Sequence, residues 1–244
     1  PPPTAIYTLS LHDALPISQI AANGISTSTI TALLRDDNFN PVVGEVIRFT
    51  TNLGTITAVD STDQFGRAEA ILESERRNGQ ALVTARFKEH VSTVPVNFTG
   101  VRLNVSATPE NLFAGGGEPT IISAYLKDAA DVPIVGEDVS FRWYMDNVYQ
   151  DVLTASTDVQ GKASIPLSSD ISGQAKIVVN AAGATDSTNV TFTRIRFTMG
   201  SNSPSVPTGG DDIDIWVQLY DTINERYITS VTVNFYTTIG AITG

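Results

Sequence analysis

The stretch TITALLRDDNFNPVVGEVIRFTTNLGTIT, residues 29–57, decides the fold, because a second stretch of the chain repeats it. The second copy reads IISAYLKDAADVPIVGEDVSFRW, residues 121–143. Four residues return 92 positions later in the same order: Asp36 as Asp128, Pro41 as Pro133, Gly44 as Gly136 and Phe49 as Phe141. An ordered set of matches at one spacing indicates tandem structural repeats.

The matches continue along the chain and predict its domain organisation. Thr62, Asp63 and Gly66 return as Thr157, Asp158 and Gly161, and Gly79-Gln80-Ala81 returns as Gly173-Gln174-Ala175. A third copy begins at DIDIWVQLYD, and its Phe235, Gly240 and Thr243 repeat Phe49, Gly54 and Thr57. We therefore expect one unit over residues 19–100, a second over 101–194, and the first half of a third over 195–244.

Each unit has the residue pattern of β-strands. Ile47 and Phe49 fall on one face of the first stretch, whereas Arg48 and Thr50 fall on the other. A period of two that is kept in every copy is typical of strands with one buried face. Asn, Asp, Gly and Pro separate these runs, as turns require. Units of about 92 residues suit an immunoglobulin-like sandwich of ~100 residues, so we expect an all-β chain of tandem sandwiches, the last one truncated.

Composition and charge exclude several classes of function. The chain has 26 acidic and 15 basic residues, a net charge of -11, and no cluster of basic residues, which argues against nucleic-acid binding. No run reaches the ~18 apolar residues that span a bilayer, so we expect no membrane segment. Cysteine is absent, which excludes thiolate nucleophiles and cysteine zinc sites.

No catalytic motif is found, and the chain is expected to be a non-enzyme without a cofactor. The sequence contains no H-E-x-x-H, no G-x-S-x-G and no P-loop lysine. Two clusters of carboxylates could supply oxygen ligands to calcium. The alternative is that aspartates at these places stabilise turns through their side chains. The candidate calcium ligands are Asp36, Asp37, Asp211 and Asp212.

The run FRWYM in the second unit offers a candidate ligand-binding platform. Trp143, Tyr144 and Tyr149 could stack against a sugar. Aromatic residues are also frequent in strands for packing alone, and alternation must bury part of this run. The platform would make the second unit a glycan-binding module.

The repeated residues resemble the bacterial immunoglobulin-like domains of invasin and intimin. The residues that carry the resemblance are Asp36, Asn40-Pro41-Val42, Gly44, Ile47, Phe49, Gly54, Ile56, Thr62-Asp63, Gly66, Ala68, Leu72, Gly79, Ala81, Val83 and Ala85. The resemblance covers roughly residues 19–244. The second copy departs from it by three extra residues between Phe141 and Thr157, and by lacking a glycine equivalent to Gly54. We expect a longer hairpin there.

Residues 1–18 do not fit the repeat. The stretch TLSLHDALPIS, residues 8–18, resembles the translation of a short-read sequencing adapter, so this segment is interpreted as non-native. The first unit would then have lost its own first strand. The β propensity of YTLSL would allow that segment to occupy the vacant place.

The resemblance implies a structural role in cell adhesion. Residues 101 and 195 follow the preceding units without a Gly/Ser linker, which favours a semi-rigid array. We expect a non-catalytic stalk of a bacterial adhesin, at the cell surface or secreted, whose host-cell receptor or surface glycan is bound by a domain outside this sequence. The alternatives are accessory modules of a secreted carbohydrate-active enzyme, or the glycan-binding module above.

Overall fold

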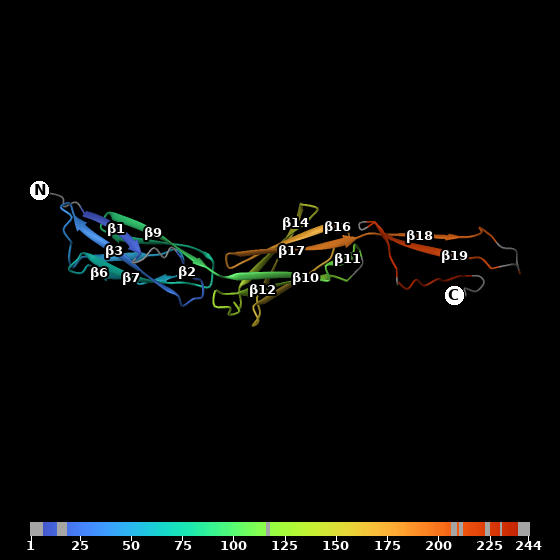
Figure 1. Ribbon diagram of the computed structural model, residues 1–244, viewed down its shortest axis with the longest axis horizontal. Coiled ribbons are helices and arrows are strands. Elements are labelled where there is room, and N and C mark those ends of the chain that lie inside the picture. The colour runs from blue at the N-terminus through green and yellow to red at the C-terminus, as the bar shows by residue number, and fades with distance from the viewer. Residues whose placement is uncertain are drawn as a thin grey trace.

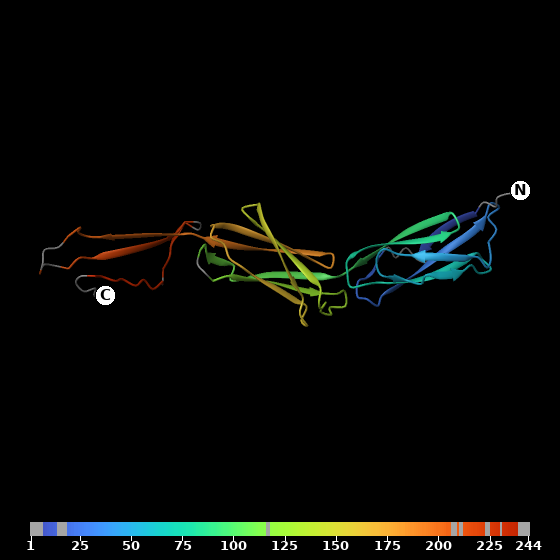
Figure 2. The ribbon, with the colours of Figure 1, turned by 180° about the vertical axis from the view of Figure 1, so that it is seen from behind.

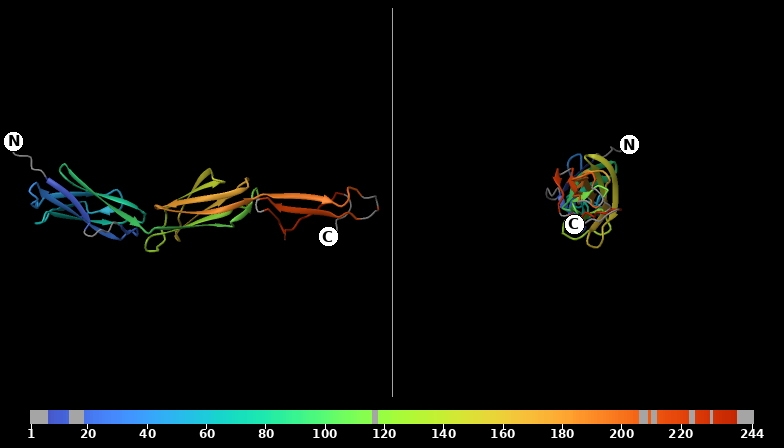
Figure 3. Two further views of the ribbon diagram at one scale, coloured as in Figure 1. Left: turned by 45° about the horizontal axis from the view of Figure 1, so that its top comes forward. Right: turned by 90° about the vertical axis from the view of Figure 1, so that its right-hand side faces the viewer.

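The computed structural model describes residues 7–13, 19–115, 118–205, 209, 212–222, 225–229 and 231–238, and all regular elements among them are β-strands. The strands form units that follow one another along the long axis of the molecule (Figure 1). The view from behind shows the same end-to-end order (Figure 2), and the units overlap when the molecule is viewed along its axis (Figure 3, right). The described residues contain no helix that could span a membrane. The prediction of an all-β chain of tandem sandwiches is confirmed.

Unit 1, residues 7–100, is a sandwich of two sheets. One sheet has the strand order β1-β3-β7-β5 and the other has the order β2-β9-β8-β4-β6. All neighbours are antiparallel except β2, which runs parallel to β9. The strands are β1 (Tyr7–Asp13), β2 (Gln19–Ala21), β3 (Thr27–Asp36), β4 (Val46–Thr50), β5 (Thr55–Ile56), β6 (Val59–Ser61), β7 (Arg67–Glu73), β8 (Gly79–Phe87) and β9 (His90–Thr99).

Unit 2, residues 101–193, repeats this plan. Its sheets have the orders β10-β12-β15 and β11-β17-β16-β13-β14. Strand β11 runs parallel to β17, as β2 does to β9. The strands are β10 (Arg102–Thr108), β11 (Asn111–Phe113), β12 (Thr120–Lys127), β13 (Asp138–Met145), β14 (Val148–Ser156), β15 (Lys162–Leu167), β16 (Gly173–Ala181) and β17 (Ala184–Thr193).

The described part of unit 3, residues 195–238, contains one sheet. Its order is β18-β19-β20, with β18 (Ile195–Ser201), β19 (Ile215–Asp221) and β20 (Arg226–Tyr227). On one face of this sheet large apolar side chains are exposed, including Phe197 at 58% and Ile215 at 49%. In units 1 and 2 a second sheet covers the corresponding face. Gly240 and Thr243, which were matched to the repeat, lie outside the described residues.

The core of each sandwich follows the alternation in the sequence. Along β7 the residues alternate between exposed and buried over all seven positions. Phe49 and Phe141 occupy equivalent positions on β4 and β13 and are almost fully buried. Burying a side chain of this size contributes ~1.5–3 kcal/mol, so the two phenylalanines are major contributors to the stability of their units.

The repeated aspartates form turns. Asp36 Oδ1 accepts hydrogen bonds from the backbone N–H groups of Asn38 and Asn40, both at 2.9 Å. Asp128 Oδ1 accepts the equivalent bonds from Ala130 and Val132 at 2.9 and 3.0 Å. One carboxylate oxygen therefore holds the loop that follows β3 in unit 1 and β12 in unit 2.

The second repeated motif forms another turn. Asp158 Oδ1 accepts hydrogen bonds from the N–H groups of Gln160 and Lys162, both at 2.9 Å. Gly161 completes the turn with a φ of 71°, and a Cβ there would lie 2.5 Å from the carbonyl oxygen of Leu126. Glycine is required here because the position combines a left-handed backbone with no room for a side chain. Gly66 in unit 1 has the same two constraints.

The longer hairpin predicted in the second copy is present. Strands β13 and β14 are joined by two residues, Asp146 and Asn147, which both have positive φ. Such φ values at both central positions define a type I′ turn. In unit 1 the strand equivalent to β14 is β6, of three residues only, whereas β14 has nine. The extra residues therefore lengthen the hairpin without changing the fold.

Strand β1 occupies the place of the first strand of unit 1. It pairs with β3 as β10 pairs with β12, and Leu9 and Leu11 pack against the core. The structure thus shows β pairing of this segment, as its propensity allows. The non-native origin of residues 1–18 stays a prediction. Residues 1–6 and 14–18, and the side chains of His12 and Asp13, lie outside the described residues.

Candidate functional site: the junctions between units

The first junction is very short. Only Gly100 and Val101 separate β9 of unit 1 from β10 of unit 2. A Cβ on Gly100 would lie 2.8 Å from the Cβ of Ala129, and the φ of Gly100 is 101°. The two units therefore approach closely at a linker of two residues, which restricts how they can move relative to each other. The orientation of unit 2 relative to unit 1 depends on the contacts across this junction.

One loop of unit 1 reaches across to unit 2. The loop between β7 and β8 contains Arg76, Arg77 and Asn78, and each contacts a different part of unit 2. Arg76 Nε lies 3.2 Å from Asp128 Oδ2, and the Asp128 side chain is only 1% exposed. Oδ1 of Asp128 is already used by its turn, and Oδ2 accepts no well-aligned hydrogen bond among the described residues. The Arg76 guanidinium is therefore the counter-charge for a buried carboxylate.

Arg77 and Asn78 add further contacts. Arg77 Nη2 lies 2.7 Å from Glu137 Oε1, with both side chains partly exposed. The Asn78 amide pairs with the backbone of Val101, donating to its carbonyl and accepting from its N–H at 2.9 Å each. The backbone N–H of Asn78 donates to the carbonyl of Ala182, again at 2.9 Å. These bonds hold both the linker and the β16–β17 hairpin of unit 2.

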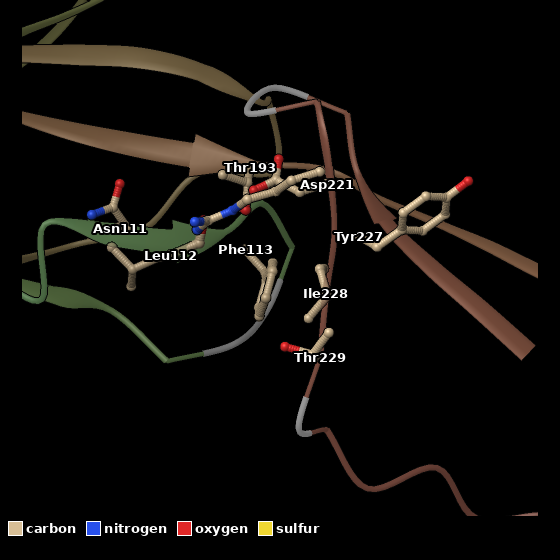
Figure 4. A pocket seen from close by; sticks show the side chains of 9 residues that line it. Asn111, Leu112, Phe113, Thr193, Asp221, Tyr227, Ile228 and Thr229 are labelled. Atoms are coloured by element: carbon tan, nitrogen blue, oxygen red, sulfur yellow. The ribbon is translucent and has the colours of Figure 1, made fainter.

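The second junction differs in sequence and in packing. Only Arg194 separates β17 from β18. The loop equivalent to residues 76–78 reads Asp170-Ile171-Ser172, so both arginines are replaced. An open cavity of about 360 Å³ lies between the β11 segment of unit 2 and residues 226–229 of unit 3. In Figure 4, Phe113 and Ile228 lie on opposite sides of it.

The candidate calcium ligands are placed as follows. The carboxylate of Asp36 is occupied by its own turn, and the backbone and side-chain amides of Asn40 hold its pKa below the ordinary value. Asp37 follows it in the same loop, Asp212 precedes β19, and Asp211 lies outside the described residues. No group of three or more potential metal-ligating side chains occurs among the described residues. Calcium binding by these aspartates stays a prediction.

The three aromatic candidates do not form one platform. Trp143 is partly buried and packs against the core. Tyr144 and Tyr149 lie opposite each other on β13 and β14, with ring centroids 5.9 Å apart in an edge-to-face arrangement. Trp143 and Tyr144 are successive strand residues and face opposite sides of the sheet, although a bulge falls between them. Any platform on the outer face would therefore consist of the two tyrosines without Trp143.

Sequence reasoning missed the loop at the first junction. The sequence pattern predicts only a turn between strands for RRNG, residues 76–79. A signal was present, because Arg76 and Arg77 have no counterpart in the second copy while the flanking residues are repeated. Charged residues that occur in one copy of a repeat but not in the other can indicate a contact between the repeats.

Comparison with known families assigns both complete units. Residues 12–101 match the family described as Invasin, domain 3, and residues 102–193 match the bacterial Ig-like domain, group 1. The chain belongs to the invasin and intimin type of bacterial Ig-like proteins. The two matched ranges meet at residues 101 and 102, in agreement with the boundary between the two sandwiches at the first junction.

Two of the proteins to which the chain is similar are named as adhesins. The chain is 25% identical over 190 residues to the inverse autotransporter adhesin YeeJ of Escherichia coli K12; the match covers 71% of this chain and 8% of that protein. The adhesin InvE of Yersinia pseudotuberculosis has a similar structure, with a TM-score of 0.52 and 24% identity over 76% of this chain and 58% of that one. Invasin, described as a bacterial integrin-binding protein, matches with a TM-score of 0.36 and 23% identity over 94% of this chain and 48% of that one.

The chain spans a small part of the YeeJ protein and just over half of the InvE chain that it matches. The family and its adhesin relatives place the protein at the bacterial cell surface. They favour an adhesin over the accessory modules of a carbohydrate-active enzyme.

Proposed function

We propose that this chain is a stiff, non-catalytic segment of an adhesin stalk, which holds an adhesive region away from the bacterial surface. The first junction carries the proposal. A buried carboxylate of unit 2 faces an arginine of unit 1, and the Asn78 side chain pairs with the backbone N–H and C=O of Val101 in the linker. Bending at this junction would separate these partners, so the contacts resist a change in the angle between the units.

The adhesive contact itself is proposed to lie elsewhere in the whole protein. Its partner would be a host-cell receptor or a surface glycan, in keeping with the adhesin relatives. The segment described here then needs length and stiffness, and the net charge of -11 favours solubility of an extended array.

Small-angle X-ray scattering of the whole chain tests the stalk. We expect an elongated particle whose maximum dimension falls when Arg76, Arg77 and Asn78 are all replaced by alanine. The matched control replaces Asp170, Ile171 and Ser172, which occupy the equivalent loop at the second junction, and should change the scattering less. An unchanged maximum dimension in the first variant, with its melting temperature showing intact units, would contradict the proposal. Repeating the measurement with calcium and with a chelator tests the calcium prediction.

A further inference from the structure

Two arginines of unit 1 lie directly opposite each other on neighbouring strands. Arg48 of β4 is paired in register with Arg86 of β8. Arg48 lies between the buried Ile47 and Phe49, so its side chain faces outward. Arg86 lies between buried residues in the same way. Directly opposite side chains in such a pair have Cβ atoms roughly 5 Å apart.

This arrangement is unfavourable for the free unit. Like charges that are directly opposite each other destabilise a sheet. Neither the Arg48 nor the Arg86 guanidinium forms a salt bridge or a side-chain hydrogen bond with any described residue, and both side chains are exposed. None of the acidic residues that the structure describes serves as the counter-charge here. A spacer function alone does not require two unpaired arginines at this place.

The positions in register with the two arginines contain no acidic side chain. The register places Val59 beside Arg48 and Val91 beside Arg86, so one row across four strands has two arginines flanked by two exposed valines. The next row along the same face consists of Thr50, Thr84 and Thr93. The turn that closes β8 and β9, Lys88–Glu89, adds one charge of each sign.

We propose that this outer face of unit 1 binds an acidic polysaccharide, through a carboxylate or sulfate group held between Arg48 and Arg86. Two guanidinium groups present planar sets of N–H donors that match such anions. The three threonine hydroxyls can donate to and accept from sugar hydroxyls, and the valines can pack against the apolar faces of sugar rings. The face belongs to an open sheet, which suits an extended polymer.

The composition of the two rows favours a polysaccharide over a protein partner. Protein interfaces concentrate binding energy in large aromatic and arginine anchors within closely packed pockets. Here the arginines are surrounded by threonine and valine, and the two rows contain no aromatic side chain. The strongly negative charge of the rest of the chain repels polyanions, so binding would be confined to this face.

The test measures binding of the whole chain to heparin, which is sulfated, and to polysialic acid, which is carboxylated, by isothermal titration calorimetry in low salt. We expect the dissociation constant for at least one of them to rise tenfold or more when Arg48 and Arg86 are both changed to Thr. The charge-matched control changes Arg67 and Arg102 to Thr and should keep the wild-type affinity. The Arg48→Thr, Arg86→Thr variant should also melt at a temperature no lower than the wild type, because the like-charge contact is gone.

Three results would overturn the proposal. They are no binding of either polymer by the wild type, equal weakening by the control variant, and binding only to vesicles that contain an anionic phospholipid. The last result would assign the face to a membrane surface. None of them concerns the scattering experiment on the stalk, so the two proposals fail independently.

Discussion

Removal of the Arg76 side chain should loosen the first junction. The Asp128 carboxylate is 1% exposed, and only Oδ1 is satisfied by its turn. Leaving a buried charge without its partner costs ~3–5 kcal/mol when both groups are buried. Arg76 is 47% exposed, so water replaces part of what is lost, and we expect about 2 kcal/mol for Arg76→Ala, within the range for an unsatisfied buried group.

This loss should appear as undocking of the units, because Asp128 regains water when the junction opens. About 2 kcal/mol corresponds to a roughly 30-fold shift of the equilibrium toward the open junction. The chain has no cysteine, so spin labels can be placed at Gln64→Cys and Gln160→Cys, two exposed turn positions, one in each unit. Double electron–electron resonance should then show a broader distance distribution in Arg76→Ala.

Arg77→Ala is the matched control. Its partner Glu137 is 25% exposed rather than buried, and exposed pairs contribute ~0–1 kcal/mol, so the distribution should change little. A double-mutant cycle with Asp128→Asn, which keeps the turn acceptor and removes the charge, should give a coupling energy above about 1 kcal/mol. Equal broadening by both alanine variants, or a coupling energy near zero, would refute the argument from burial.

Three further predictions follow from the turns and the core. Gly161→Ala should destabilise unit 2 by several kcal/mol in chemical denaturation, because the added Cβ would lie 2.5 Å from a backbone oxygen. In the control Gly136→Ala the added Cβ has no atom within 4 Å, so this variant should cost only the ~1–2 kcal/mol of its left-handed backbone. The pKa of Asp36 is lowered, so its contribution to stability is complete above the unfolded value of 3.8 and is lost as the pH falls through the lower folded pKa; a carboxyl NMR titration with its midpoint at or above 3.8 would contradict this. Phe141→Ala should cost unit 2 ~3–5 kcal/mol, and a melting curve in which unit 1 is affected equally would show that the units do not unfold independently.

Much of the fold follows from local pattern, which is why sequence reasoning reached it. The alternation of apolar and polar residues around Ile47 and Phe49 specifies which face of the strand is buried. This pattern can be recognised from a few neighbouring residues. The repeated Asp and Gly positions specify turns through side-chain acceptors and positive φ, which are also local. The extra length after Phe141 indicated a longer hairpin for the same reason.

The arrangement of the candidate site residues does not follow from the sequence, because it depends on positions far apart in the chain. Trp143 and Tyr144 are adjacent in sequence but separate onto two faces of a sheet, with one against the core. The junction depends on Arg76 meeting Asp128, which lies 52 positions further along the chain, across a linker whose direction no local pattern specifies.

The sequence by itself determined that this protein is a tandem array of β-sandwiches, because burial, turn formation and repetition are recorded within each unit. Only the tertiary structure decided that Arg76 faces a buried carboxylate of the next unit, and that Arg48 and Arg86 lie directly opposite each other. The register between strands and the docking between units depend on contacts between residues that lie far apart in the sequence, so no local pattern specifies them.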